Sequence, residues 1–189
     1  MQLIPDVSIK SKKVKPKLVI VMGVSGCGKS TVGKQLAKLI NYEFIEADDF
    51  HSVAAKQQMA NGIPLTDAMR DPWLRRLTQY LCQGTLADSV LAYSGLRHQH
   101  RQLFRELGFT TLFIHLTTDL DTISQRMSLR AGHFMPESML ASQFNSMQLP
   151  EYEADIISLD VSADLQPIIE IAHAVVALMK VHGWQVLLN

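Results

Sequence analysis

The stretch "VIVMGVSGCGKSTVG", Val19 to Gly33, joins an apolar run to a loop of small residues that ends in a lysine. Leu18–Met22 is apolar on both faces, as expected for a strand of a parallel sheet that helices cover on both sides. Three glycines follow and permit backbone turns that residues with a side chain resist. Between Thr31 and Ile40, apolar residues recur at helical spacing. The stretch therefore predicts a strand, a glycine-rich loop and a helix in immediate succession.

This order matches the phosphate-binding loop pattern G-x-x-x-x-G-K-[ST]. Backbone N–H groups in such a loop point inward and form a nest for an anion, and the N-terminus of the helix adds partial positive charge. Lys29 would reach the β- and γ-phosphates of a nucleotide, and the hydroxyl of Ser30 would ligate Mg²⁺. A glycine-rich structural turn is the alternative, but all four fixed positions of the pattern are filled.

The predicted nucleotide-binding residues are Gly23, Val24, Ser25, Gly26, Cys27, Gly28, Lys29, Ser30 and Thr31. Cys27 occupies a free position of the pattern, where a small packing residue is favoured over a catalytic thiol. A phosphate loop alone does not distinguish kinases, GTPases, ATPases and transporter engines. The chain has no N-K-x-D guanine signature and no transporter-type S-G-G-Q, and it is short. A small-molecule kinase is the simplest remaining class.

Length and composition limit the number of domains, the compartment and the partners that we expect. A chain of 189 residues with 47% hydrophobic residues suits one globular domain, which we expect over residues 17–189 behind a flexible, lysine-rich tail at 1–16. An acidic partner for these lysines is the alternative. No apolar run is long enough to cross a bilayer, no signal core is evident, and two cysteines suggest no disulfide framework, so we expect a cytoplasmic protein without a membrane partner. The 18 basic and 18 acidic residues balance, which argues against nucleic-acid binding.

Further predicted strands and helices alternate along the chain. We expect strands at Glu43–Ala47, Ser89–Tyr93, Thr111–Leu116 and Asp155–Leu159, and helices at Ser52–Ala60, Pro72–Gln83, Arg97–Leu107, Leu120–Leu129, Pro136–Met147 and Leu165–Val181. This alternation predicts an α/β fold with a five-stranded parallel sheet wrapped on both faces. Ligand sites in such sheets lie at the carboxyl ends of the strands, which places the phosphate loop beside Asp48 and Ser94. Residues 126–150 are expected to form a helical lid.

Five stretches carry a family resemblance: "MGVSGCGKST", "ADDFH", "NGIPLTDAMRDPWL", "RAGHF" and "SQFNSMQLP". In order and spacing they resemble gluconate kinases of the thermoresistant type, and "PLTDxxRxPWL" is the most specific piece. The resemblance covers nearly the whole chain after Lys17. It implies the nucleoside-monophosphate-kinase variant of the phosphate-loop fold and phosphorylation of D-gluconate at its 6-hydroxyl. It also implies ATP and Mg²⁺ as cofactors and, because the family is commonly dimeric, a homodimer.

The resemblance assigns roles to two residues after the second strand. Asp48 would accept the proton of the substrate hydroxyl or hold Mg²⁺ through water, whereas a helix N-cap is the structural alternative. His51 would hydrogen-bond a polyol or a carboxylate, whereas a surface histidine without a function is the alternative. Asp49 is the weaker candidate of the acidic pair.

Three arginines are candidates for the acceptor. Arginine holds a carboxylate bidentately, so Arg70, Arg97 and Arg101 would bind a sugar acid. The alternatives are a structural pair of Arg70 with Asp67 or Asp71 and, for Arg101, an exposed position on a helix.

A second group of basic residues belongs to the expected lid. Arg126 and Arg130 are four residues apart on one helix face and, by the resemblance, would close over the phosphates and neutralise the transferring phosphoryl group. A solvated basic face is the alternative. His133, in "RAGHF", would belong to the same cover and contact the substrate.

The acceptor-side motifs depart from the family pattern. The family's C-S-A-L-K is replaced by "YSGLR", Tyr93–Arg97, its next Tyr and Asp by His100 and Gln102, and two glutamates by Asn145 and Gln148. One reading is a working kinase for gluconate or a related sugar acid. The other is a degenerate nucleotide-binding protein with a regulatory or assembly role. A shikimate or nucleotide kinase is a third option, but it does not explain "PLTDxxRxPWL". We favour the enzyme, and we expect Gly95→Ala with Arg97→Lys to improve gluconate turnover.

Overall fold

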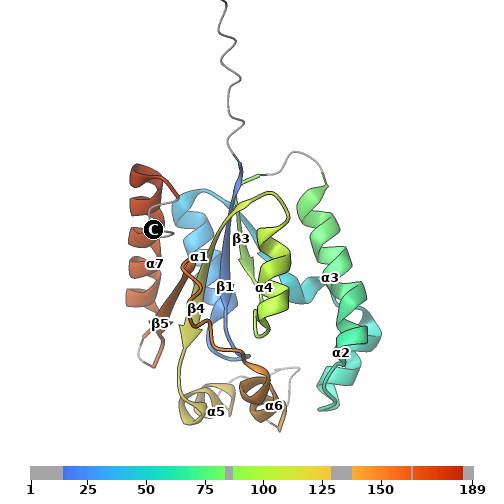
Figure 1. Cartoon of the computed structure of the whole chain (residues 1–189). Coiled ribbons are helices and arrows are strands. Elements are labelled where there is room, and N and C mark those ends of the chain that lie inside the picture. The colour runs from blue at the N-terminus through green and yellow to red at the C-terminus, as the bar shows by residue number, and fades with distance from the viewer. Residues whose placement is uncertain (1–14, 84–86, 129–137, 163, 185–189) are drawn as a thin grey trace, which may run out of the picture.

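Five parallel strands form one sheet in the computed structural model, which describes residues 15–83, 87–128, 138–162 and 164–184 (Figure 1). The strands are β1 (Lys17–Met22), β2 (Glu43–Glu46), β3 (Ser89–Ala92), β4 (Thr110–Thr117) and β5 (Ile156–Asp160). The helices are α1 (Lys29–Ile40), the 3₁₀ helix η1 (Ala47–Phe50), α2 (Val53–Ala60), α3 (Asp67–Cys82), α4 (His98–Arg105), α5 (Leu120–Ser128), α6 (Ser138–Ser146) and α7 (Leu165–His182). The predicted α/β class and its five-stranded parallel sheet are confirmed.

The sheet has the strand order β2-β3-β1-β4-β5. The chain leaves β1 for the edge strand β2, returns to β3, and then crosses to β4 on the other side of β1. The loops after β1 and β3 therefore start from neighbouring strands, which is where doubly wound sheets bind ligands. Figure 1 shows α5 and α6 at the end of the sheet toward which the strands run.

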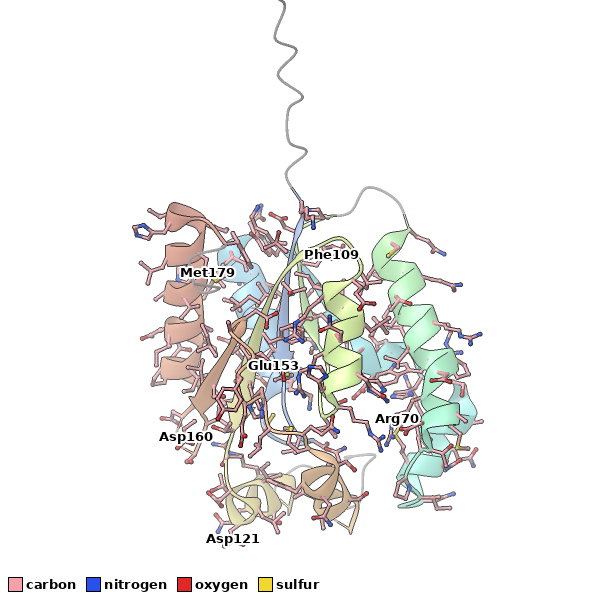
Figure 2. All side chains as sticks on the ribbon, in the orientation of Figure 1. Arg70, Phe109, Asp121, Glu153, Asp160 and Met179 are labelled. Atoms are coloured by element: carbon pink, nitrogen blue, oxygen red, sulfur yellow. The ribbon has the colours of Figure 1, made fainter. Side chains whose placement is uncertain are left out.

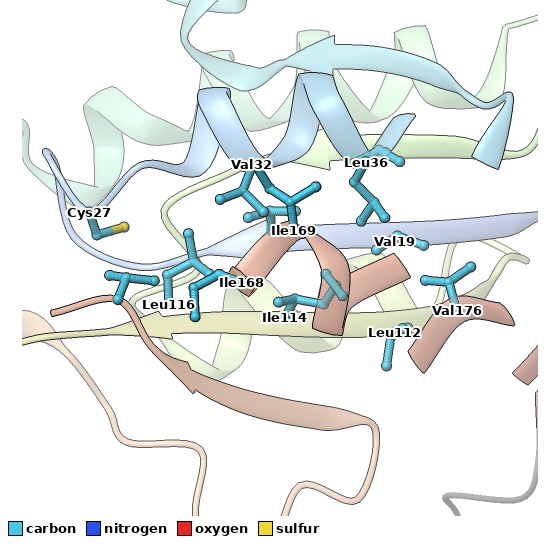
Figure 3. Packing of buried hydrophobic residues seen from close by; sticks show 14 of the residues in the cluster. Val19, Cys27, Val32, Leu36, Leu112, Ile114, Leu116, Ile168, Ile169 and Val176 are labelled. Atoms are coloured by element: carbon cyan, nitrogen blue, oxygen red, sulfur yellow. The ribbon is translucent and has the colours of Figure 1, made fainter. Parts of the chain in front are cut away.

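Apolar side chains of β1 alternate between two cores, one on each face of the sheet. Val19 and Val21 pack on one face with apolar residues of α1 and α7, whereas Leu18 and Ile20 pack on the other with α3 and α4. Figure 3 shows the first core, in which side chains from β1, α1, β4 and α7 meet. Burial on both faces explains why the sequence of β1 is continuously apolar rather than alternating.

The start of α3 differs from the prediction. The helix begins at Asp67 rather than Pro72, because the carbonyl of Thr66 already accepts hydrogen bonds from the N–H groups of Met69 and Arg70. Pro72 is therefore inside the helix, in its second turn, where it cannot donate an N–H to the carbonyl of Ala68. As a consequence, Arg70 lies on the first turn of a helix instead of in a loop.

The ends of the chain and the expected lid are described only in part. Of the predicted tail at 1–16, residues 1–14 lie outside the described residues, whereas the carbonyl of Pro16 accepts a hydrogen bond from the N–H of Thr110. Of the expected lid at 126–150, residues 129–137 also lie outside, between α5 and α6.

The last helix is apolar on more than one side. Within the described ranges, α7 is the one helix whose length and mean hydropathy would suffice to cross a membrane. Its buried residues, among them Ile169 and Val176, pack into the core beside α1. This helix therefore covers one face of the sheet, while Leu178 and Val181 on its other side are exposed.

Candidate functional site

The phosphate loop begins in a space that only glycine fits. Gly23 has a φ of 142°, and a Cβ atom there would lie 2.6 Å from the carbonyl oxygen of Leu116. The loop ends at Gly28, with a φ of 103°, which is the N-cap of α1. No side chain caps this helix and its first turn has no acidic residue, so its N–H groups and positive dipole are left for an anion.

Side chains hold the phosphate loop in shape. The Nζ atom of Lys29 donates a hydrogen bond to the carbonyl of Val24 at 2.9 Å, so the ammonium group lies across the loop. Cys27 is fully buried, and burial raises the pKa of its thiol, which agrees with a packing role rather than a nucleophilic one. The backbone N–H of Gly23 donates to the carbonyl of Ser94 at 3.1 Å, which ties the loop after β1 to the loop after β3.

An acidic residue that the sequence interpretation missed lies beside the predicted metal ligand. The carboxylate of Glu46, at the end of β2, lies close enough to the hydroxyl of Ser30 to interact with it. Burial raises the pKa of Glu46, and the negative charge of Asp48 adds to the shift. The signal in the sequence was the spacing of Glu46 and Asp48, which are two residues apart at the end of a strand.

These oxygen atoms suit Mg²⁺ in type. Across the described ranges, no three His, Cys, Asp or Glu side chains come together as a metal site of their own. Magnesium in phosphoryl-transfer enzymes is held by one or two protein oxygens together with water and the phosphates of the nucleotide. A hydroxyl and a carboxylate beside the phosphate loop fit that kind of site.

A pocket beside the phosphate loop brings together predicted site residues from separate parts of the sequence. Lys29, Asp48, His51 and Arg70 all line it. Figure 2 shows Arg70 on α3, on the side that faces α4. The rest of the lining consists of Ser25, Met59, Pro64, Leu65, Trp73, Ala92, Tyr93, Ser94, Leu96, Ser142, Gln143 and Ser146. The pocket thus joins a cationic loop to a carboxylate, an imidazole and a guanidinium group.

Aromatic rings form one wall of this pocket. The imidazole of His51 stacks on the indole of Trp73, with centroids 4.2 Å apart and planes at 15°, and Trp73 in turn stacks on Tyr93. The indole N–H donates to the carbonyl of Ala47 at 2.7 Å, which fixes the stack against η1. Trp73 is therefore both a buried packing residue and part of the pocket wall.

His51 is neutral at neutral pH. Burial lowers its pKa to about 4, although the carboxylate of Asp48, 3.8 Å from Nε2, acts in the opposite direction. Within the described part of the chain, its buried Nδ1 atom has no hydrogen-bond partner. A neutral imidazole with an unsatisfied nitrogen can bind a hydroxyl group of a ligand.

Asp67 pairs with two of the predicted substrate arginines. Its Oδ1 atom accepts from Arg70 at 2.8 Å and its Oδ2 atom from Arg97 at 2.7 Å. Arg70 thus forms the ion pair with Asp67 that was its structural alternative, and it also lines the pocket. Arg97 is not among the lining residues. One carboxylate between two guanidinium groups leaves a single net positive charge at this edge.

The structure does not bring Arg101 to the pocket. Its side chain is fully buried, its Nε atom is 3.1 Å from both carboxylate oxygens of Glu153, and its Nη1 atom donates to the carbonyl of Gly95 at 2.8 Å. Figure 2 shows Glu153 beside α4. This geometry does not support the predicted role of Arg101 as a direct ligand of the sugar acid, because the protein itself occupies the guanidinium group. The alternative of an exposed arginine is wrong, because the side chain is buried.

The departures from the family pattern after β3 fit one another. The hydroxyl of Tyr93 and the Nδ1 atom of His100, both in altered positions, are hydrogen-bonded at 3.1 Å inside the protein. Gly95 has a φ of 63°, and a Cβ atom there would lie 2.8 Å from the Cβ of Met22. A Cβ atom at position 95 would therefore strain this loop, which argues against the expectation that Gly95→Ala with Arg97→Lys improves gluconate turnover.

The lid residues are only partly described. Arg126, on α5, donates a hydrogen bond to the carbonyl of Val161 after β5, and its charge is close enough to act on Cys27 in the phosphate loop. It does not line the pocket described above. Arg130 and His133 lie outside the described residues, so their predicted roles stay predictions.

Comparisons with known proteins agree along most of the chain. Residues 18–150 match the family described as "AAA domain". The chain is 38% identical to the thermosensitive gluconokinase of Escherichia coli (strain K12), with 80% of this chain and 82% of that protein covered. It is 37% identical to a gluconokinase of Gluconobacter oxydans, with 76% and 82% covered. The crystal structure of a gluconokinase from Sinorhizobium meliloti matches at 35% identity with a TM-score of 0.78, over 88% of this chain and 95% of that one.

Proposed function

The chain belongs to the gluconokinase family of phosphate-loop kinases, and we propose that it transfers the terminal phosphoryl group of ATP to the 6-hydroxyl of D-gluconate. The observation that carries this proposal is the pocket in which Lys29, Asp48 and Arg70 meet. The reaction requires a group that binds the phosphates of the donor, a group that accepts a proton and a group that anchors the carboxylate of the acceptor, and these three residues supply them in that order.

The donor side is the phosphate loop. The N–H groups at the uncapped start of α1 bind the phosphates, and Lys29 leaves Val24 to neutralise the β- and γ-phosphates. Mg²⁺, when bound, neutralises charge on the same phosphates. The hydroxyl of Ser30 would hold it directly, with the carboxylates of Glu46 and Asp48 nearby to bind its water molecules.

The acceptor side lies across the pocket. Asp48 accepts the proton of the attacking hydroxyl, His51 hydrogen-bonds a neighbouring hydroxyl, and Arg70 holds the carboxylate of the sugar acid. Asp67 accepts a hydrogen bond from the guanidinium group of Arg70 and thereby keeps that group oriented. The aromatic wall excludes water from one side of the site, which strengthens these contacts.

Nothing in the site favours the degenerate alternative. The buried hydrogen bond between Tyr93 and His100 shows that two altered positions are matched to each other, which is unlike unconstrained loss. We also propose that residues 17–189 act as one domain of a homodimer in the cytoplasm. The dimer is supported by the family resemblance alone, and the cytoplasm by two cysteines that are both free.

A coupled measurement of ADP release tests the proposal. We expect MgATP turnover to rise several-fold with D-gluconate or a close six-carbon sugar acid, and not with glucose, shikimate or a nucleoside monophosphate. Binding of MgATP is measured separately by calorimetry. Tight binding of MgATP without acceptor-dependent ADP release would contradict the kinase proposal. Stimulation of ADP release by shikimate would overturn the sugar acid as substrate but would leave phosphoryl transfer as the reaction.

A further inference from the structure

Gln143, on α6, reaches into the phosphate loop. The backbone N–H of Ser25 donates a hydrogen bond to its Oε1 atom at 2.7 Å, across 118 residues of sequence. Both residues line the pocket that also contains Asp48 and Arg70. The contact therefore lies at the end of the phosphate loop that faces the acceptor.

Two hydrogen bonds hold the chain that follows α6 against residues 96–98 after β3, here called the acceptor loop. The backbone N–H of Gln148 donates to the carbonyl of Leu96 at 2.8 Å, and the side-chain Oε1 of Gln148 accepts from the N–H of His98 at 2.6 Å. These two bonds involve protein atoms only. Because the C-terminal end of α6 is fixed in this way, Gln143 is presented to Ser25 by the fold and needs no ligand to reach it.

The bonded atoms are those that a phosphate would use. Backbone N–H groups of a phosphate loop bind phosphoryl oxygens, and the amide carbonyl of Gln143 now occupies one such donor. Of the phosphates of a nucleotide, the terminal one lies nearest the acceptor, and Ser25 lies on that side of the loop. A terminal phosphoryl oxygen and the Gln143 carbonyl therefore compete for the same N–H.

We propose that Gln143 is a positioning residue that acts as a latch: it satisfies the Ser25 N–H while the loop is empty and is displaced by the terminal phosphoryl group of the donor. The inference rests on the proposed function, because the displacing ligand is a nucleoside triphosphate. Its consequence is that the contact distinguishes a triphosphate from a diphosphate, because only the third phosphoryl group competes for the Ser25 N–H.

Calorimetry with the Mg²⁺ complexes of ADP and of a non-hydrolysable ATP analogue tests the latch in two variants. Gln143→Ala removes the competing carbonyl, so the analogue should bind about threefold to tenfold more tightly, which is the worth of one hydrogen bond. Gln143→Glu keeps an acceptor for Ser25 but charges it, so the analogue should bind about tenfold or more weakly. ADP affinity should change by less than about twofold in Gln143→Ala. Asn145→Ala, an exposed amide on the same helix, is the matched control and should change neither affinity.

The opposite signs distinguish the latch from other roles. A merely structural role would weaken binding in both variants, and a direct role in holding the triphosphate would weaken it in Gln143→Ala; either result overturns the proposal. An equal gain for ADP and the analogue would also overturn it, because the competition would not involve the third phosphate. Acceptor-dependent ADP release by the unchanged protein is measured in parallel, so failure of the latch is separable from failure of the proposed reaction.

Discussion

Arg101 and Glu153, 52 residues apart in the sequence, form a buried ion pair that also holds the loop carrying Gly95. Arg105, on the next turn of α4, forms ion pairs with the same carboxylate and with that of Asp155. Burial acts to raise the pKa of Glu153, but the hydrogen bonds from Arg101 and Arg105 outweigh it and hold that pKa below its ordinary value. Glu153 is therefore charged at neutral pH and fixes α4 against the strand β5.

Glu153→Gln should destabilise the protein by about 3 kcal/mol, because it leaves the buried guanidinium of Arg101 without its counter-charge. Urea unfolding at pH 7 measures the change. Arg97→Gln, which breaks a partly exposed pair with Asp67, is the control and should cost at most about 1 kcal/mol. Equal losses in the two variants would mean that burial does not set the energy of the Arg101 pair.

Lys29→Met should abolish phosphoryl transfer while leaving the fold intact. Loss of a charged contact to the transferring group in a partly dry site costs about 3–4 kcal/mol, or roughly 10²–10³ in rate. Turnover is measured with saturating gluconate, and circular dichroism checks the fold. Lys38→Met, on an exposed part of the same helix, should behave as the unchanged protein, and full activity of a well-folded Lys29→Met variant is incompatible with the proposed reaction.

Asp48→Asn should bind ATP normally and turn over about 10²-fold more slowly, because the amide has the shape of the carboxylate but cannot accept the proton. Asp49→Asn is the matched control, since Asp49 is the neighbouring exposed carboxylate and does not line the pocket. The reverse result, with Asp49→Asn impaired and Asp48→Asn active, would move the site by one residue.

Gly95→Ala should lower the free energy of unfolding by about 1–3 kcal/mol, because a side chain is forced into the left-handed region against Met22. The same variant should turn over gluconate more slowly than the unchanged protein, since Gly95 lies between the Arg101 contact and the pocket. Chemical unfolding and the ADP assay measure the two effects. Gly108→Ala is informative as a control, because its φ is also positive but its Cβ would meet no atom within 4 Å.

Stability should fall as the pH falls from 6.5 to 4, in part because of His115. Burial, with the charge of Arg101 adding to it, lowers the pKa of His115 in the folded protein from 6.5 to about 4. Between these values the unfolded chain binds more protons, so the free energy of unfolding decreases with falling pH, by at most about 1.4 kcal/mol per pH unit for one histidine. His51 acts in the same direction.

Urea unfolding at several pH values between 7 and 4.5 measures this slope. The variant His115→Gln should show a shallower dependence on pH, whatever its absolute stability, because the titrating ring is gone. His98→Gln, at an exposed position, should retain the original slope. An unchanged slope in His115→Gln would assign the acid sensitivity elsewhere.

The parts of the site that could be predicted are those that a local pattern encodes. Lys29 follows from the spacing of the phosphate loop, Asp48 from a short motif at the end of β2, and Arg70 from the motif "PLTDxxRxPWL". The pocket brings these three residues together as expected. The start of α3 was misplaced because proline is common in a first turn, whereas the carbonyl of Thr66 begins the helix five residues earlier.

The parts that could not be predicted depend on contacts between distant segments. Nothing local to Arg101 indicates that Glu153 will neutralise it, and nothing in the phosphate loop indicates that Gln143 will bind Ser25 from 118 residues away. Such contacts are set by how α4 and α6 pack on the finished sheet. An arginine on a helix has the same sequence signature whether it faces a substrate or a buried carboxylate.

The hydrogen bond between Gly23 and Ser94 has a consequence for how this enzyme can change. The two loops that it joins start from neighbouring strands, β1 and β3, so the separation between them is set by the spacing of strands, about 4.8 Å. Substitutions of side chains do not alter that spacing. Under the proposed function, the identity of the acceptor depends on side chains of α3 and of the loop after β3. New substrates can then be acquired one residue at a time, while the separation of the two loops stays the same.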